Sequence, residues 1–214
     1  MTLWAIVSDA HSRSDRLARV LADAQAAGAE RVLSLGDVGG VPAIEILARA
    51  GAAHVFGNWE ASGLRGLPQP YRSEVARWPA RRIEDGFWAA HASPVWPDGL
   101  GAGGVVDHLR AHGLHWTELF PPLQHSPEAR RAAFAALEAA DVPLFFHGHT
   151  HTQEVWRQQP GGAPARVATT EFDIPADGSR WLVGVGSAGD PHDGVGLAYA
   201  LYDSGLGHVA LRRV

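Results

Sequence analysis

The sequence predicts an α/β fold built on parallel strands, and two observations carry this prediction. Short apolar runs alternate with amphipathic segments over residues 3–56. This alternation is typical of βαβ units, in which successive strands run parallel. Each apolar run also ends in a polar residue, at the sheet edge where open α/β folds place their ligands. The first quarter of the chain is therefore expected to build a sheet with a functional edge.

Three strands and two helices are predicted in this part of the chain. The predicted strands are 3–8, 31–35 and 53–56. Ser14 is expected to cap a helix over residues 14–27, and Gly28 to end it. A second helix over residues 42–50 has Pro42 in its first turn, where the missing N–H of proline costs nothing.

The rest of the chain is less regular. Residues 75–82 and 86–91 are predicted to form a hairpin through the turn Glu84-Asp85-Gly86. Residues 92–146 are rich in Pro, Gly, Trp and His. We interpret them as an insertion or lid within one domain spanning residues 1–214. Helices are predicted at 105–112 and 127–140, and further strands at 144–147, 154–157, 166–170, 181–186, 196–202 and 208–212.

Composition excludes several kinds of chemistry. The 214 residues include no Cys and no Lys, so all 18 basic residues are Arg. A thiolate nucleophile, a Cys-ligated metal, a Walker A loop and a Schiff-base lysine are therefore excluded. The net charge of −5 offers no general attraction for nucleic acid or anionic membranes. The first residues resemble a strand, with no secretion signal, and the cytoplasm is the expected location.

Twelve histidines remain as the unusual feature, and four of them follow predicted strands. Together with acidic and amide side chains at the same strand ends, they form a set of seven donors: Asp9, His11, Asp37, Asn58, His91, His149 and His151. Oxygen and nitrogen donors of this kind suit divalent Mn, Fe, Zn or Co. Seven donors are too many for one four-coordinate ion but divide between two ions if Asp37 bridges them. The glycines before Asp37, Asn58 and His149 are expected to let the backbone turn sharply.

Each of these motifs alone has an ordinary structural interpretation. Asn58 is then a turn residue, His91 a strand-end histidine, and His149 with His151 part of a polar surface strand. The order of the motifs, D-x-H, G-D, G-N, H and G-H-T-H, favours the metal centre. This order resembles the calcineurin-like metallophosphoesterase superfamily. Residues 183–193 also resemble the N-P-G-S-x-G-x-P-R-D stretch of its small bacterial and archaeal phosphodiesterase branch.

The resemblance implies a four-layer α-β-β-α sandwich of two mixed sheets flanked by helices. It implies a first metal ion held by Asp9, His11 and His151, and a second held by Asn58, His91 and His149. Asp37 bridges the two ions. Asp37, Asn58 and His91 are taken as catalytic residues too. The ions are Mn, Fe, Zn, Co or Ni, with Mn favoured.

The implied activity is hydrolysis of a phosphodiester or nucleotide by attack of a metal-bridging hydroxide. The expected partner is a small phosphorylated substrate, without membrane or nucleic acid, and homo-oligomerisation is left open. A non-catalytic scaffold on the same fold, as in retromer-like relatives, is an alternative. A phosphomonoesterase, a protein phosphatase and a DNA-processing nuclease are further alternatives.

One residue departs from the superfamily pattern. Trp59 stands where the usual G-N-H-D/E motif has a histidine that helps to protonate the leaving group. Trp59 can be a stacking surface for substrate, a packing residue against the insertion, or a sign of lost activity. His192 is a candidate substrate contact. It is also one of five possible substitute acids, with His108, His112, His115 and His125.

Overall fold

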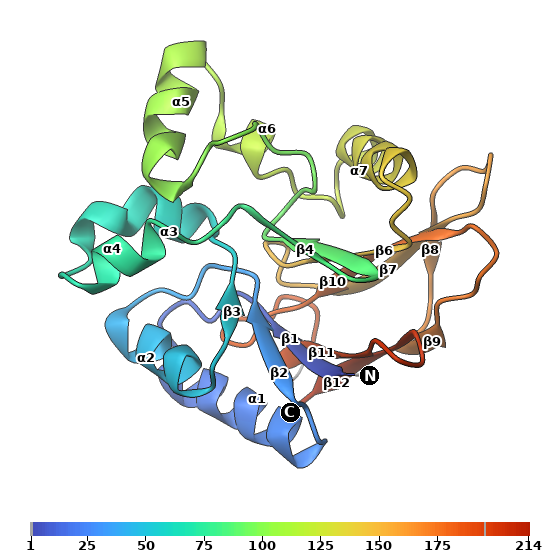
Figure 1. Cartoon of the computed structure of the whole chain (residues 1–214), viewed down its shortest axis with the longest axis horizontal. Coiled ribbons are helices and arrows are strands. Elements are labelled where there is room, and N and C mark those ends of the chain that lie inside the picture. Colours follow the sequence, from blue (N-terminus) through green and yellow to red (C-terminus); the bar gives the residue numbers. More distant parts are fainter. Residues whose placement is uncertain (1, 195) are drawn as a thin grey trace.

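Two mixed β-sheets of six strands each lie face to face in the computed structural model of the chain, with helices on both outer sides (Figure 1). The structure describes residues 2–194 and 196–214. The order of the layers is helix, sheet, sheet, helix. The predicted α-β-β-α sandwich is therefore confirmed.

The first sheet combines parallel and antiparallel pairing. Its strands are β1 (Leu3–Val7), β2 (Arg31–Ser34), β3 (Ala53–His54), β9 (Glu171–Asp173), β11 (Ala198–Asp203) and β12 (His208–Arg213). They lie in the order β3-β2-β1-β11-β12-β9. β1, β2 and β3 run parallel, as the βαβαβ pattern predicts, and β11 pairs antiparallel with β1.

The second sheet has the same mixed character. Its strands are β4 (Arg81–Glu84), β5 (Phe87–Ala90), β6 (Leu144–His147), β7 (Gln153–Gln158), β8 (Ala165–Val167) and β10 (Arg180–Val185). They lie in the order β4-β5-β6-β10-β7-β8, with β5, β6 and β10 parallel. The parallel strands of both sheets therefore point their carboxyl ends toward the same region of the molecule (Figure 1).

Helices cover the two outer faces and one end of the sandwich. The α-helices are α1 (Ser14–Ala26), α2 (Val41–Arg49), α3 (Asn58–Gly63), α4 (Tyr71–Val75), α5 (Val105–His112), α6 (Trp116–Leu119) and α7 (Pro127–Ala139). Short 3-10 turns lie at Leu64–Gly66 and Ala102–Gly104. α1 and α2 pack on the first sheet and α7 on the second, whereas α3 to α6 gather beyond the strand ends (Figure 1).

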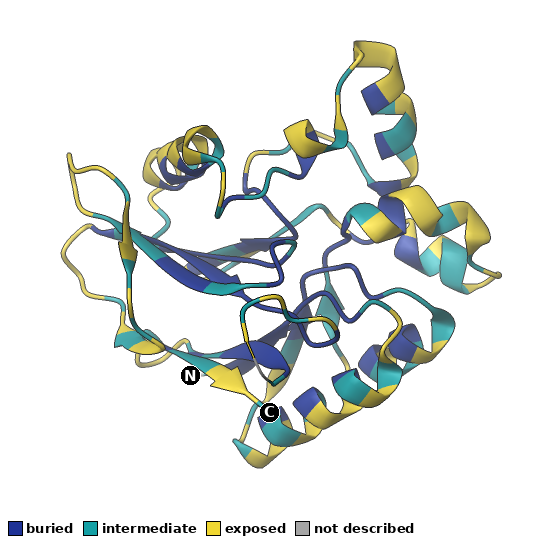
Figure 2. Ribbon diagram, turned by 180° about the vertical axis from the view of Figure 1, so that it is seen from behind, coloured by how far each residue is buried: buried dark blue, intermediate teal, exposed yellow. Residues whose placement is uncertain are grey.

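One hydrophobic core lies between the sheets. Ile6, Leu33, Phe146 and Val183 meet there and are fully buried. Burial of each such side chain contributes about 1.5–3 kcal/mol relative to exposure. Figure 2 shows the same division, because the helices turn buried residues toward the sheets and exposed residues outward. No helix in the described residues is long and apolar enough to cross a membrane.

Several predicted elements differ from the structure. The predicted strand over 75–82 is wrong, because Val75 ends helix α4 and the strand is β4 at Arg81–Glu84. The predicted strand over 166–170 is shorter, since residues 168–170 separate β8 from β9. Ser14 is not the helix cap: it is the first residue of α1, and Arg13 before it makes no side-chain cap.

Residues 92–146, interpreted as an insertion, lie in two different places. α5 and α6 stand beside α3 at the strand ends, whereas α7 forms the outer layer on the second sheet (Figure 1). Residues 144–146 are already part of the central strand β6. The lid interpretation therefore concerns the segment before α7 and stays a prediction.

His54 in β3 gives the fold a predictable sensitivity to acid. Its ring stacks on Trp78, with centroids 4.1 Å apart, and burial together with nearby Arg82 lowers the pKa of His54 to about 4. As the pH falls below about 6.5, the unfolded chain takes up a proton there and the folded chain does not. Folding stability is therefore lost between pH 6.5 and pH 4.

We expect His54→Phe, which keeps a ring against Trp78, to reduce this loss. Between pH 7.5 and pH 5 the wild type should lose on the order of 2 kcal/mol more unfolding free energy than the variant. Urea unfolding at both pH values measures the difference. An equal loss in both proteins would contradict the assignment.

Candidate metal centre

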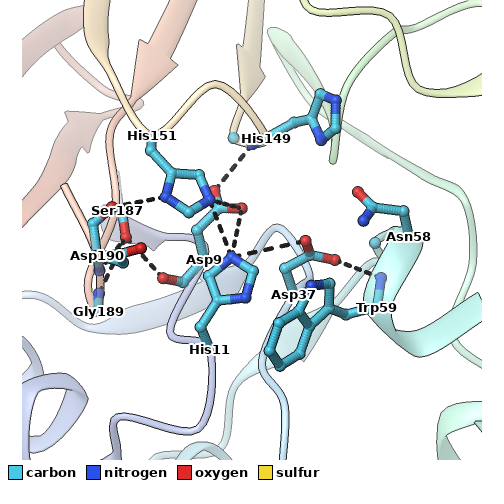
Figure 3. A network of polar contacts seen from close by, with 12 residues as sticks. Asp9, His11, Asp37, Asn58, Trp59, His149, His151, Ser187, Gly189 and Asp190 are labelled. Atoms are coloured by element: carbon cyan, nitrogen blue, oxygen red, sulfur yellow. Dashed lines mark hydrogen bonds and ion pairs between the residues drawn. The ribbon is translucent and has the colours of Figure 1, made fainter. Parts of the chain in front are cut away.

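Polar side chains from both sheets meet at the carboxyl ends of the parallel strands (Figure 3). Asp9 follows β1 and Asp37 follows β2, while Asn58 opens α3 directly after β3. His91 follows β5 in the second sheet. His149 and His151 follow β6. The topology therefore brings the seven predicted donors to one place.

The first cluster joins two imidazoles and a carboxylate. The Nε2 atoms of His11 and His151 lie 2.9 Å apart, and they are 3.7 Å and 3.4 Å from Oδ1 of Asp9. That Asp9 oxygen is buried and has no hydrogen-bond partner in the described chain. Two imidazole nitrogens and an unpartnered carboxylate oxygen aimed at one point form a site that suits a divalent cation.

The second cluster contains the other carboxylate. Nε2 of His91 lies 3.0 Å from Oδ1 of Asn58 and 3.5 Å from Oδ2 of Asp37. The same Asp37 oxygen lies 3.8 Å from Nε2 of His11 in the first cluster. Asp37 therefore stands between the clusters, where a bridging ligand would stand.

Backbone carbonyls fix the orientation of two of these rings. Nδ1 of His91 lies 2.8 Å from the Leu35 carbonyl oxygen, and Nδ1 of His151 lies 2.6 Å from that of Asp190. When Nδ1 donates its proton to a carbonyl, Nε2 keeps a lone pair for a metal ion. Both rings are thus oriented with Nε2 toward the centre, as ligation requires.

His149 is placed differently from the other predicted ligands. Its backbone N–H donates to Oδ2 of Asp9 over 2.9 Å. Its ring packs beside His91, with centroids 5.1 Å apart, and points away from His11 and His151 (Figure 3). Three donor groups converge within 4.8 Å in the described chain, and none of them contains His149: Asp9 with His11 and His151, Asp9 with Asp37 and His91, and His151 with Asp190 and His192.

The ionisation of the site reflects its excess of buried negative charge. Burial alone would raise the pKa of Asp9, but the nearby imidazoles of His11, His151 and His91 hold it well below its usual value. Burial lowers the pKa of His91, yet nearby Asp37 and Asp9 raise it to about 9. Burial and the charge of His91 lower the pKa of His149 to about 4. The carboxylates of Asp9 and Asp37 thus stabilise positive charge on and beside His91.

The backbone at the site is unusual. Seven non-glycine residues of the described chain have positive φ, and five of these are predicted ligands: Asp9, His11, Asp37, His149 and His151. This conformation is uncommon for residues with a side chain, and such residues cluster at functional sites. The intrinsic backbone preferences of these residues therefore do not explain their positive φ angles. The need to direct their side chains toward one point does.

The donor set fits a pair of divalent metal ions of the Mn, Fe, Zn or Co type, because it mixes carboxylate, amide and imidazole ligands. The profile of the calcineurin-like phosphoesterase superfamily domain matches residues 1–205. The chain belongs to this superfamily. No curated protein matches the sequence.

Solved structures show the same fold. The chain is similar to a metallophosphoesterase from Sphaerobacter thermophilus at 21% identity and a TM-score of 0.73, over 99% of this chain and 88% of that one. It is similar to an archaeal phosphodiesterase at 14% identity and a TM-score of 0.55, over 99% of both chains. A predicted phosphoesterase from Streptococcus pneumoniae matches at 13% identity and a TM-score of 0.51, over 99% and 89% of the two chains.

Three glycines precede predicted ligands at the site of this phosphoesterase domain. At two of them the backbone does not turn sharply, and glycine is required because a side chain would not fit. Gly36 has φ +94, as the predicted sharp turn requires. Gly57 has φ −107, and a Cβ there would lie 2.1 Å from Oδ1 of Asp37. A Cβ on Gly148 would lie 1.9 Å from Oγ of Ser8. The expectation of a turn is therefore wrong at Gly57 and Gly148, where close approach excludes a side chain.

Glu60 supports the site, and the sequence analysis assigned it no role. Its buried carboxylate accepts the backbone N–H groups of Asp37 and Gly57 at Oε2, both at 2.8 Å. Oε1 accepts that of Val38 at 2.9 Å. One carboxylate thus joins the Asp37 loop to the turn that carries Asn58. An acidic residue three positions after Gly57 is typical of a helix capping box, and this pattern was the available signal.

Ser187 has a similar role on the other side of the centre. Its hydroxyl donates to the Asp9 carbonyl oxygen over 2.7 Å and accepts the N–H groups of Gly189 and Asp190. Asp190 in turn accepts from His151 through its carbonyl. The stretch that resembles the superfamily's N-P-G-S motif therefore holds Asp9 and His151 in place.

Trp59 and His192 lie at the opening of the centre. The Trp59 ring packs edge-to-face against His11, with centroids 4.3 Å apart, and stays 45% exposed. The His192 ring stacks on His151 at 4.3 Å and is exposed. The other suggested acids make local contacts instead: His108 stacks with His112, His115 caps α6, and His125 contacts Gln124.

We expect Glu60→Gln to weaken metal binding. A glutamine turns an NH₂ group toward backbone N–H donors, so part of the support of the Asp37 loop is lost. Loss of such support in a metal site typically costs 10–100-fold in affinity. Calorimetric titration with Mn²⁺ measures the effect, and Glu128→Gln on the exposed face of α7 is the matched control. Wild-type affinity in a folded Glu60→Gln protein would contradict the role of Glu60.

Proposed function

We propose that the protein hydrolyses a phosphate ester, with phosphodiesters or nucleotides as its main substrates, at a centre that holds two divalent metal ions. The placement of Asp37 carries this proposal, because one of its oxygens lies within 4 Å of both His11 and His91. Membership of the phosphoesterase superfamily supports the same reaction class.

The donors divide between two positions. Asp9, His11 and His151 would hold one ion, Asn58 and His91 the other with His149 beside them, and Asp37 would contact both. When bound, such ions activate water as a nucleophile and neutralise negative charge on the phosphoryl oxygens. Mn²⁺ is the ion we favour.

The side chains of this chain determine how the substrate is held. The sequence has no Cys or Lys nucleophile. Phe120, 2% exposed, packs on His91 with ring centroids 5.9 Å apart and excludes water from that side. The substrate phosphate would therefore approach from the side of His11 and His151.

Trp59, the residue after Asn58, limits which substrates are hydrolysed well. Trp59 carries an indole N–H that does not titrate and so cannot act as a general acid. Its backbone N–H donates to Oδ1 of Asp37 over 2.8 Å, which fixes the residue beside the centre. Substrates whose leaving group departs without protonation are therefore favoured.

We expect the Mn²⁺-loaded protein to hydrolyse bis(p-nitrophenyl) phosphate with a higher kcat/KM than simple alkyl phosphate monoesters. Asp37→Asn should lower kcat/KM by at least roughly 100-fold, because it removes charge from a direct ligand. Asp107→Asn, at an exposed position of α5, is the control and should leave kcat/KM unchanged. A colorimetric rate assay over this panel measures all three effects.

Two results would count against the proposal. Equal kcat/KM values for activated diesters and alkyl monoesters would contradict the leaving-group argument. Absence of hydrolysis with every metal and substrate would favour the non-catalytic scaffold instead.

A further inference from the structure

The surroundings of the metal centre differ on its two sides. On the side of His91 and His149, the ring of Phe120 covers both imidazoles, with Trp96 and Trp116 packed against it. His91 is 1% exposed. On the other side, the side chains of His11 and His151 are 13% and 11% exposed. A substrate larger than a phosphate group therefore has to extend past His11 and His151.

An open pocket of about 360 Å³ lies there, which we call the entrance pocket. Besides the two metal-ligand histidines, its lining consists of Ser12, Arg13, Trp59, Asp190 and His192. A volume of this size lies within the range of small-molecule sites. The acidic side chain in the lining, Asp190, lies 3.7 Å from Nε2 of His192.

Arg13 supplies a positive charge to this pocket. Its side chain is exposed, and it forms no ion pair or side-chain hydrogen bond with the residues that the structure describes. Arg16, one turn further along α1, instead donates to the Gly189 carbonyl oxygen over 2.7 Å. An arginine in this position can bind an anionic group with two parallel hydrogen bonds.

Trp59 supplies a planar apolar surface in the same pocket. Its hydrogen bond to Asp37 holds the backbone, and its contact with His11 holds the ring. A tryptophan held this way and still 45% exposed offers a surface on which a planar ring can stack. Arg13 and Trp59 thus provide binding for two chemically different parts of one ligand.

We propose that the entrance pocket binds the non-reacting part of the substrate, with a planar ring on Trp59 and a second phosphate on Arg13. The substrate class is then a nucleotide that carries a phosphate besides the one that reacts. This inference rests on the proposed phosphoesterase function, and it names which esters that site prefers.

The test compares adenosine 5′-(p-nitrophenyl phosphate) with its 3′-phosphorylated form. These two esters share a leaving group that needs no protonation and differ by one phosphate. The Mn²⁺-loaded wild type should show at least about tenfold higher kcat/KM for the 3′-phosphorylated ester, since a charged hydrogen-bonding pair contributes about 1.5–3 kcal/mol. Arg13→Gln should lower the ratio of the two kcat/KM values toward one, and Arg13→Lys should restore part of it. Arg19→Gln, at an exposed arginine within α1, should keep the wild-type ratio.

The role of Trp59 is tested by measuring whether its substitution changes KM or kcat. Trp59→Ala should raise KM for adenosine 5′-(p-nitrophenyl phosphate) roughly fivefold or more with little change in kcat, because stacking of one base contributes about 1–3 kcal/mol. Trp59→Phe keeps an aromatic ring and should recover most of the loss. A fall in kcat alone, or no recovery with Phe, would overturn the role of Trp59.

Failure of the inference and failure of the function are distinguishable. If bis(p-nitrophenyl) phosphate is hydrolysed but the two adenosine esters show equal kcat/KM, the entrance-pocket proposal is wrong and the phosphoesterase proposal stands. If no ester is hydrolysed, the phosphoesterase proposal is wrong. In that case, calorimetry of adenosine 3′,5′-bisphosphate binding still tests the pocket. Weaker binding to Arg13→Gln but not to Arg19→Gln supports the entrance-pocket proposal. Equal affinity of the wild type and both variants overturns it.

Discussion

Two buried carboxylates, Asp9 and Asp37, lie within 4.8 Å of each other and of a nitrogen of His91. Like charges at this distance repel strongly in a partly desolvated site unless positive charge lies between or beside them. The raised pKa of His91 is one response to this charge. A divalent cation would neutralise this negative charge more fully than a protonated histidine. The surrounding structure holds the carboxylates where such an ion would bind.

This arrangement is made by backbone that other parts of the fold keep in place. Asp9, His11, Asp37, His149 and His151 all have left-handed backbone conformations. Each such residue costs of order 1–3 kcal/mol, and the surrounding hydrogen bonds offset this cost. Glu60 holds the Asp37 loop and Ser187 holds Asp9. The stable sandwich of two sheets therefore supports a strained rim that carries the candidate metal ligands.

Much of this architecture could be predicted because strand ends are easy to recognise. Apolar runs that stop at Asp9, Asp37 and His91 mark both the strands and the rim. The helices α3, α4 and α6 were missed, because four to six residues are too few to show helical periodicity. The role of Glu60 depends on backbone groups more than 20 residues away, which no local pattern shows. The ring of His149 and the spatial need for Gly57 likewise depend on tertiary contacts.

The two sides of the metal centre differ in exposure, and the entrance pocket lies on the open side. The segment around Phe120 covers one side of the rim, and α1 begins at the other with Arg13 exposed. The residues that differ from the superfamily pattern, Trp59 and His192, both lie at this open side. Under the proposed function, these two residues would select which ester is held while the ligand set stays intact.

The central claim is that Asp37 is shared by two metal ions. A crystal structure of the Mn²⁺-loaded protein, with anomalous scattering measured for manganese, tests it most directly. The account predicts two anomalous peaks about 3.5–4 Å apart, both in contact with the Asp37 carboxylate. A single peak, or two peaks of which one does not contact Asp37, would contradict it.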